Sequence, residues 1–159
     1  MNTKDNAKFN IVLVTGVIEK RGKFLIAQRD HDEIQAPGKW ALPGGKVEVE
    51  GEYLDILETA LKREIKEEVG LVIYDEPIYV RSGSFIRVDE APVVSVLFLC
   101  KWKSGKAKPL EDSIDIAWID IKELEKYDFA PGVKKALKEA DKKNNELSDK
   151  SSDRAQDKR

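Results

Sequence analysis

The sequence contains a single cysteine, Cys100, and a single histidine, His31. One cysteine cannot form a disulfide within the chain, so the fold is not built on a disulfide framework. One histidine gives poor support for a histidine-based metal site or a catalytic triad. Basic residues are not in excess, because 28 Lys and Arg stand against 30 Asp and Glu. The charge balance therefore gives no strong indication of nucleic acid as a partner.

Long hydrophobic runs are also missing from the sequence. The longest apolar stretch, Ala91–Cys100, is too short to span a bilayer. The first six residues, Met-Asn-Thr-Lys-Asp-Asn, are polar and lack the hydrophobic region of a signal peptide. We therefore expect no association with membranes and a cytoplasmic location. A chain of 159 residues is long enough for one domain with a substantial core.

The pattern of apolar residues predicts an α/β fold. Runs of β-branched residues bounded by glycine predict strands at residues 9–19, 23–29, 40–42, 78–86, 93–102 and 117–120. The principal helix is predicted at 53–69, ended by Gly70, and a second helix at 133–140. We expect a flexible N-terminus at 1–8, a single domain at 9–143 and a disordered polar tail at 144–159. This mixed order of elements predicts a mixed β-sheet sandwiched between helices.

Three carboxylates near the end of the predicted principal helix are the main candidate site. Glu64, Glu67 and Glu68 are spaced i, i+3 and i+4, so they share one patch of the helix surface. Like charges this close repel one another unless a cation neutralises them. Carboxylate oxygens are ligands that Mg²⁺ and Mn²⁺ prefer, usually together with substrate phosphates. The spacing therefore indicates a divalent-metal site for phosphate chemistry.

The alternative reading of these carboxylates is a solvated acidic face, as on most charged helices. The helical period argues against it. At about 100° per residue, Glu64 and Glu68 border an apolar stripe, with Glu67 beside them. The stripe is formed by Leu54, Leu57, Leu61 and Ile65. Burying part of three negative charges without a partner would be costly. We therefore favour the metal site.

The segment Arg63–Leu71 resembles the second half of the signature of the Nudix hydrolases, Arg-Glu-apolar-any-Glu-Glu-any-Gly-apolar, and follows a Pro-Gly-Gly run at 43–45. The resemblance covers roughly residues 9 to 140. It implies an α/β/α sandwich with a mixed sheet and hydrolysis of a pyrophosphate bond with Mg²⁺, for which Mn²⁺ is a potential substitute. The first half of the signature departs from the family, because the chain carries four extra residues between Gly45 and Arg63. We expect the principal helix to begin one turn early as a result.

The resemblance also suggests roles for individual residues. It implies that Glu64, Glu67, Glu68 and the carbonyl of Gly45 bind the metal. In the family, the first Glu of the signature pairs with the Arg. Glu52 holds that place here by its Gly-Glu context and Asp55 by its distance from Arg63, and we favour Glu52.

Two further roles have more than one candidate. The general base is either Glu64 or a carboxylate from a distant loop, where we select Glu111. Candidate substrate contacts are Arg29, Lys46 and the Gly-Gly turn at 44–45, although an ion pair between Arg29 and Asp30 or Glu33 is the competing interpretation.

The substrate is inferred by elimination. Markers that some Nudix subgroups carry about fifteen residues after the signature are absent around residues 84–88. We therefore expect a nucleoside triphosphate or modified nucleotide, cleaved to a nucleoside monophosphate and pyrophosphate. The alternatives are a nucleoside diphosphate linked to another group, of the ADP-ribose or nucleotide-sugar type, a non-catalytic nucleotide sensor, or an RNA-associated role of the Lys-rich C-terminal region. Exposed strand edges also suggest a homodimer.

Overall fold

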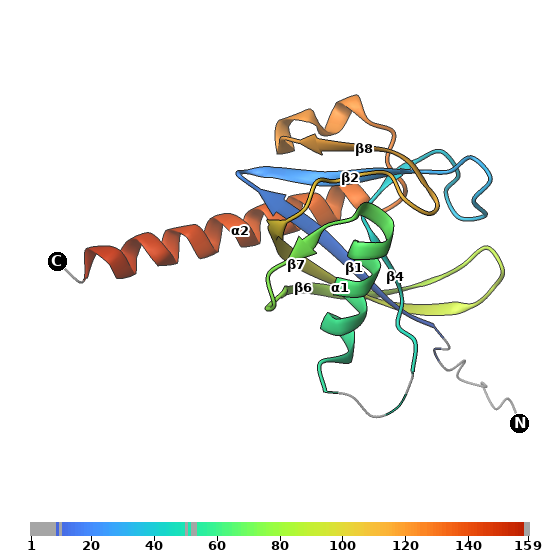
Figure 1. Ribbon diagram of the computed structural model, residues 1–159, viewed down its shortest axis with the longest axis horizontal. Helices are drawn as coiled ribbons and strands as arrows, with labels where there is room; N and C mark the ends of the chain where they lie inside the picture. The colour runs from blue at the N-terminus through green and yellow to red at the C-terminus, as the bar shows by residue number, and fades with distance from the viewer. Residues whose placement is uncertain (1–8, 10, 50, 52–53, 158–159) are drawn as a thin grey trace, which may run out of the picture.

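A mixed β-sheet separates two helices in the computed structural model, which describes residues 9, 11–49, 51 and 54–157 (Figure 1). Helix α1 (Ile56–Val69) covers one face of the sheet, and α2 (Val133–Gln156) covers the other. The strands are β1 (Ile11–Lys20), β2 (Lys23–Arg29), β3 (Trp40–Ala41), β4 (Gly44–Lys46), β5 (Val72–Ile73), β6 (Ile78–Ile86), β7 (Pro92–Ser104) and β8 (Ser113–Ile119). A 3-10 helix, η1 (Ile121–Lys126), follows β8.

The parallel pair of β1 and β7 forms the centre of the sheet, with residues 11–19 of β1 alongside 93–101 of β7. On its other edge β1 has two partners. Its residues 13–15 pair with β4, and its residues 19–20 pair with β2. Strand β2 continues the sheet toward β3 and β8, whereas β5 and β6 pair with β7. The sheet therefore diverges between β2 and β4, beside the second half of α1.

Alternate residues of the central strands supply two separate cores. The residues that pack beneath α1 include Val14, Ile18, Leu25, Phe98 and Cys100 together with Leu61 and Ile65 of the helix. The residues that pack beneath α2 include Val17, Phe24, Ile26 and Leu99 together with Ala136, Leu137 and Ala140 of that helix. Because side chains of a strand alternate between faces, one sheet can serve both cores. The predicted α/β/α sandwich with a mixed sheet is confirmed.

The sequence led us to expect that the principal helix begins one turn early. The structure shows that it does not. It begins at Ile56, and the described residues before it are not helical. Leu54, predicted to belong to the apolar stripe of this helix, lies before it and is 92% exposed. Asp55 occupies the N-cap position with a left-handed backbone, φ +55°, and its side chain makes no capping hydrogen bond. The extra residues of the chain therefore lengthen the loop between β4 and α1 and add no turn to the helix.

The second helix is much longer than predicted, because it continues to Gln156 through the segment expected to be disordered. Leu147 packs against the core beneath α2, and Asn144 accepts a hydrogen bond from Lys101. Farther along, the hydroxyls of Ser148 and Ser151 donate to carbonyls four residues back. Once the first turns are docked, each further residue adds a hydrogen bond without a new nucleation cost. Amino-acid composition alone does not reveal this effect.

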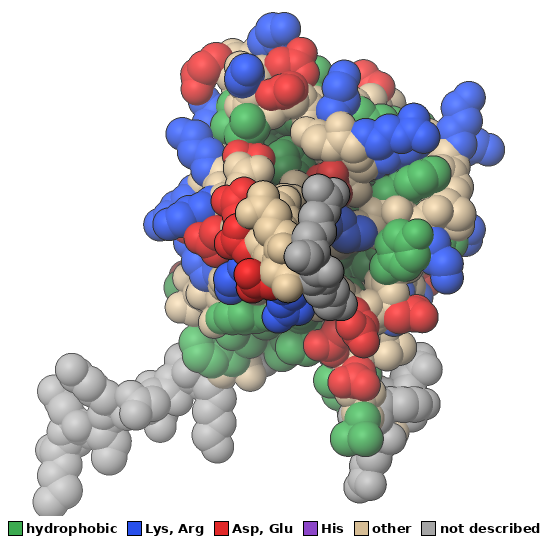
Figure 2. Space-filling model, turned by 90° about the vertical axis from the view of Figure 1, so that its left-hand side faces the viewer, with side chains coloured by type: hydrophobic (Ala, Val, Ile, Leu, Met, Phe, Trp, Pro, Cys, Tyr) green, Lys and Arg blue, Asp and Glu red, His purple; other side chains and the backbone are tan. Residues whose placement is uncertain are grey.

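The last turns of α2 project beyond the sheet (Figure 1). On the face where the helix ends, acidic and basic side chains are interspersed (Figure 2). None of the described helices combines the length and apolar character needed to cross a membrane. The division of the chain into a domain at 9–143 and a tail remains a prediction.

We expect a variant that ends at Asn144 to lose helical signal in far-ultraviolet circular dichroism. The lost signal should correspond to the helical residues 145–156, because the full-length chain forms helix there. Removing Leu147 should also lower the free energy of unfolding by about 1–2 kcal/mol, since its side chain is only partly buried. An unchanged spectrum after truncation would show that this segment is disordered in solution.

Candidate active site

The end of α1 lies against β4, and this contact builds the core of the candidate site. The N–H of Gly44 donates to Oε2 of Glu68 at 3.2 Å. A Cβ added to Gly45 would lie less than 3.0 Å from the carboxyl group of Glu64, and one added to Gly44 would meet the carbonyl oxygen of Val14. Only glycine lets this strand pass so close to both the helix and β1. The two carboxylates therefore sit directly beside the Gly-Gly backbone.

Glu68 is largely buried, and its electrostatics are unusual. Burial raises the pKa of the Glu68 carboxyl to about 8, the N–H of Gly44 opposes this shift, and the negative charges of Glu64 and Glu111 add to it. The positive charge of Arg29 also lowers the pKa of Glu68. A carboxyl group with such a pKa carries a proton near neutral pH unless a cation replaces that proton.

Glu64 is the second partly buried carboxylate, with a side chain 13% exposed. Burial raises the pKa of Glu64, and Arg63 is the positive charge that opposes the shift. The negative charges of Glu67, Glu111 and Glu48 raise the pKa of Glu64 further. Negative charge thus converges on Glu64 from the helix, from the segment after β4 and from a loop that precedes β8.

Arg63 and Glu67 lie at the outer side of this cluster. Nη1 of Arg63 is 3.0 Å from Oε1 of Glu64 and 3.4 Å from Oε2 of Glu67. The Arg63 and Glu67 side chains are about 40% exposed, so their ion pair is weak and easily exchanged for other partners. Glu67 is therefore held at the rim, whereas Glu64 and Glu68 are fixed inside.

The loop between β7 and β8 brings Glu111 to the site. Backbone hydrogen bonds fasten this loop to the end of α1, from the N–H of Leu110 to the carbonyl of Glu68 and from the N–H of Lys108 to that of Val69, both at 3.0 Å. Glu111 itself has φ +47°, a strained conformation for a residue other than glycine. Such strain is characteristic of residues held in place for function. Glu111 is exposed, and its negative charge acts on both Glu64 and Glu68. Its role as a base stays a prediction.

Arg29 ends β2 near Glu68, but its guanidinium already has partners. Its Nε donates to the carbonyl oxygen of Gln35 at 2.6 Å, and its Nη2 pairs with Glu33 at 2.9 Å. The ion pair with Glu33 is the competing interpretation drawn from the sequence. In this state Arg29 organises the loop that follows β2. Lys46 lies exposed at the end of β4, opposite Leu13.

Among the described residues, Arg63 pairs with Glu64 and Glu67 and with neither candidate named from the sequence. Glu52, the favoured candidate, lies outside the described residues. Asp55 is exposed, and within the described part of the chain no ion pair joins it to Arg63. Glu48, which was not among the predicted site residues, carries a charge that acts on both Arg63 and Glu64. Its position three residues after Gly45 could have identified it, because the pairing of β4 with β1 fixes where the chain leaves the sheet.

The donor set suits a hard divalent cation. Carboxylate oxygens are the ligands such ions prefer, and the buried, proton-retaining Glu68 is the kind of group that a cation would stabilise in its charged form. As the side chains stand, no three potential ligands among the described residues converge enough to enclose an ion. Glu67 is turned toward Arg63, and their exposed ion pair is weak enough to yield to a cation.

The fold and the carboxylate cluster define an α/β protein with a candidate divalent-metal site, and comparisons with known proteins give its family. The model of the NUDIX domain matches residues 8–140. The nucleoside triphosphatase NudI of Escherichia coli O139:H28 is 30% identical over 135 residues, covering 79% of this chain and 93% of that protein. The chain belongs to the Nudix family and is a pyrophosphohydrolase.

Solved structures support the fold. The MutT protein of Methanosarcina mazei Go1 is 24% identical with a TM-score of 0.67, covering 84% of this chain and 94% of that one. The NUDIX domain of Shewanella oneidensis NrtR, solved with ADP ribose, is 17% identical with a TM-score of 0.70, covering 86% and 90%. At these identities the likeness concerns the arrangement of the sheet and helices. Nudix hydrolases generally use a divalent metal, which agrees with the donor set described above.

The raised pKa of Glu68 predicts how stability depends on pH in metal-free protein. Glu68 keeps its proton in the folded state up to about pH 8, whereas the unfolded chain loses it near pH 4.5. The folded state binds more protons in this interval, so the free energy of unfolding should fall as pH rises from 5 to 8. We expect a loss on the order of 2–4 kcal/mol, measured by urea unfolding with EDTA.

Glu68→Gln should flatten this dependence, because the amide does not titrate and its oxygen can still accept from Gly44. Glu67→Gln is the matched control, since Glu67 lies at the exposed rim of the same helix. A pH dependence that is equally steep in Glu68→Gln and wild type would contradict the assignment.

Proposed function

We propose that this protein is a Mg²⁺-dependent hydrolase that cleaves a nucleoside triphosphate or modified nucleotide to a nucleoside monophosphate and pyrophosphate. The observation that carries the proposal is the pair of partly buried carboxylates, Glu64 and Glu68, set beside the Gly44–Gly45 backbone. The 30% identity to a nucleoside triphosphatase over most of both chains supports this substrate class. Mn²⁺ is expected to substitute for Mg²⁺, because both prefer carboxylate oxygens.

The roles of the residues follow from their positions. Glu64, Glu67, Glu68 and the carbonyl of Gly45 would hold the metal, which when bound masks phosphate charge and acidifies a water. Gly44 fixes Glu68 through its N–H, and Arg63 orients Glu64 at 3.0 Å. Arg29 and Lys46 would contribute positive charge toward the substrate phosphates, with Arg29 exchanging Glu33 for phosphate. Pre-positioned charges of this kind supply much of the rate in phosphoryl transfer.

The reaction is a substitution at phosphorus by water. The water oxygen forms a bond to phosphorus, the bond to the bridging oxygen breaks, and pyrophosphate leaves with that bonding pair. The proton of the water passes to a carboxylate. Glu111 and Glu64 are the two candidates, and Glu111 has the advantage that it makes no ion pair among the described residues that would hold it away from the water. We assign the base to Glu111.

The first test is a panel of nucleotides with Mg²⁺ and with Mn²⁺, scored by release of pyrophosphate and of phosphate. The panel includes the nucleoside triphosphates, ADP-ribose and a nucleotide sugar. We expect turnover of triphosphates with pyrophosphate as product, and Glu68→Gln should lower kcat/KM by about a hundredfold or more. Glu76→Gln, an exposed carboxylate after β5, is the matched control and should keep wild-type activity.

Three outcomes would change the proposal. Selective turnover of ADP-ribose or the nucleotide sugar would move the substrate to a nucleoside diphosphate with a second group. Tight nucleotide binding in a thermal shift assay without turnover would leave a sensor. Unchanged activity in folded Glu68→Gln would remove the carboxylate pair from the chemistry.

The base can be identified separately from the metal ligands. If Glu111 accepts the proton, Glu111→Gln should lower kcat by about 10²- to 10⁴-fold while leaving Mn²⁺ affinity close to wild type. Glu64→Gln should weaken Mn²⁺ binding as well, measured by electron paramagnetic resonance of free Mn²⁺. Near-normal kcat in Glu111→Gln would transfer the role of base to Glu64.

A further inference from the structure

Strand β6 forms an edge of the sheet. It pairs with β7 along residues 78–86, and among the described residues no other strand pairs with it. An edge strand presents a row of backbone N–H and C=O groups that can pair with another strand. Proteins usually protect such edges with charged residues or proline, but β6 reads Ile-Tyr-Val-Arg-Ser-Gly-Ser-Phe-Ile and has only Arg81 as a charge. A bulge at residues 79–81 interrupts its start, so residues 81–86 form the regular part.

The side chains of this edge are unusually apolar for an exposed strand. Tyr79 is 54% exposed, Phe85 45% and Ile86 66%. They lie on both faces of the sheet. Tyr79 contacts the ring of Phe98 on the α1 side, whereas Arg81 reaches α2 on the other side, and Phe85 shares the face of Arg81 because it is four residues on. Apolar surface flanking an open strand edge is typical of a protein interface.

Gly83 lies in the middle of the regular part of β6. A Cβ added to it meets nothing within 4 Å, and its backbone is not left-handed. Glycine inside a strand weakens the strand, so it usually marks a place where another backbone or ligand approaches closely. The space at Gly83 is open among the described residues, so it leaves room for a group from another molecule.

A second copy of β6 fits this edge when it runs antiparallel about a two-fold axis at Gly83. The two copies of Gly83 then face each other, and Ser82 faces Ser84 of the other copy. Arg81 faces Phe85, which is a favourable cation–aromatic pair, and no like charges are opposed. At the bulge, two residues of β6 occupy one position of the ladder. Tyr79 therefore comes opposite Ile86 of the other copy, on the α1 side. The exposed apolar residues of one strand thus meet suitable partners on the other.

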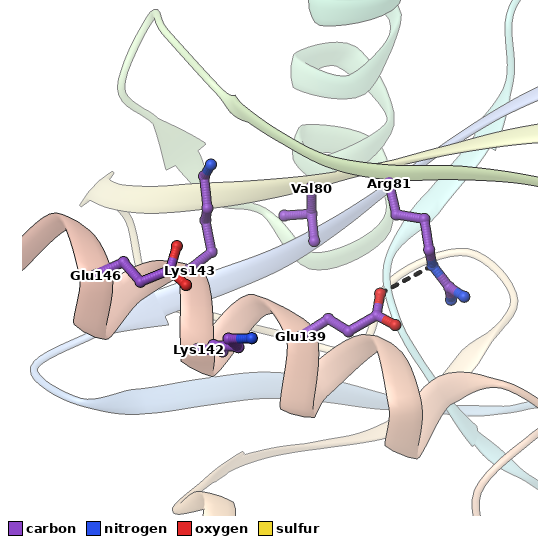
Figure 3. Close-up of a pocket in the computed structure, with 6 residues that line it drawn as sticks. All are labelled: Val80, Arg81, Glu139, Lys142, Lys143 and Glu146. Atoms are coloured by element: carbon purple, nitrogen blue, oxygen red, sulfur yellow. Dashed lines mark ion pairs between the residues drawn. The ribbon is translucent and has the colours of Figure 1, made fainter.

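The surroundings of the edge leave room for this arrangement. An open groove of about 340 Å³ runs between β6 and α2, lined by Val80, Arg81, Glu139 and the charged residues Lys142, Lys143 and Glu146. Figure 3 shows Arg81 extending from β6 to Glu139, and their ion pair measures 2.9 Å. The guanidinium is therefore held on the α2 side, where Phe85 of a second copy would lie against it.

We infer that β6 is the interface of a homodimer in which two sheets join into one through antiparallel β6 strands centred on Gly83. The interface is formed by residues 79–86 and takes no part in the carboxylate cluster. The inference does not depend on which substrate is hydrolysed. The association should be reversible, because the regular ladder is short and few side chains meet.

Cross-linking tests the register directly. Directly opposed residues of antiparallel strands have Cα separations of about 4.5–5.5 Å, within the range of a disulfide. Gly83→Cys should therefore form a disulfide-linked dimer under mild oxidation of the full-length protein. Ser82→Cys is the matched control and should cross-link much more slowly alone, but readily when mixed with Ser84→Cys. The native Cys100 is buried and should not interfere.

Charge at the axis tests the same geometry without oxidation. In Gly83→Glu the two new carboxylates oppose each other, so the dimerisation constant measured by sedimentation should weaken by about tenfold or more. A mixture of Gly83→Glu with Gly83→Lys should restore dimers. Ser151→Glu, on the exposed end of α2, is the control and should leave association unchanged. A wild type that stays monomeric at every concentration, or faster cross-linking of Ser82→Cys than of Gly83→Cys, would overturn the inference.

Discussion

The close packing of the Gly44–Gly45 backbone between β1 and α1 is the constraint on which the site depends. Gly44 touches the backbone of β1 on one side and holds Glu68 on the other. A side chain at either glycine would push the strand away from the helix and open a path for water to the carboxylates. The partial burial of Glu64 and Glu68, and hence their raised pKa values, follow from this contact.

Burial of these groups is unfavourable for the folded protein alone. A carboxyl group that must keep a proton near neutral pH adds nothing to the stability of the folded protein at that pH. The like charges around it destabilise the cluster further. Two arginines lie at the margin of the carboxylate cluster, but Arg29 also pairs with Glu33 and Arg63 also pairs with Glu67. This incomplete neutralisation leaves room for a cation and for the charge that develops in a reaction. Sites that trade stability for function in this way are common in enzymes.

Much of this arrangement could be predicted from periodicity. Of the predicted stripe, Leu57, Leu61 and Ile65 pack into the core and place Glu64 and Glu68 at its border, whereas Leu54 is exposed. Strand β6 has the bounds predicted from its β-branched residues. The remaining features depend on long-range contacts. The far end of α2 is helical because its beginning is docked. The contribution of Glu48 and the support of Glu111 by Leu110 arise where distant segments meet, which spacing along one element does not reveal.

The extra residues before α1 show that the site does not depend on the length of the loop that joins β4 to α1. The N–H of Val47 donates to the carbonyl of Val12, which fixes the exit from β4, and α1 is fixed by its own apolar face. Both halves of the site are thus anchored to the sheet independently of residues 48–55. Lengthening a loop from five to nine residues costs only about 0.5 kcal/mol in closure entropy. The departure from the family spacing therefore changes the connection and leaves the contact between Gly44 and Glu68 in place.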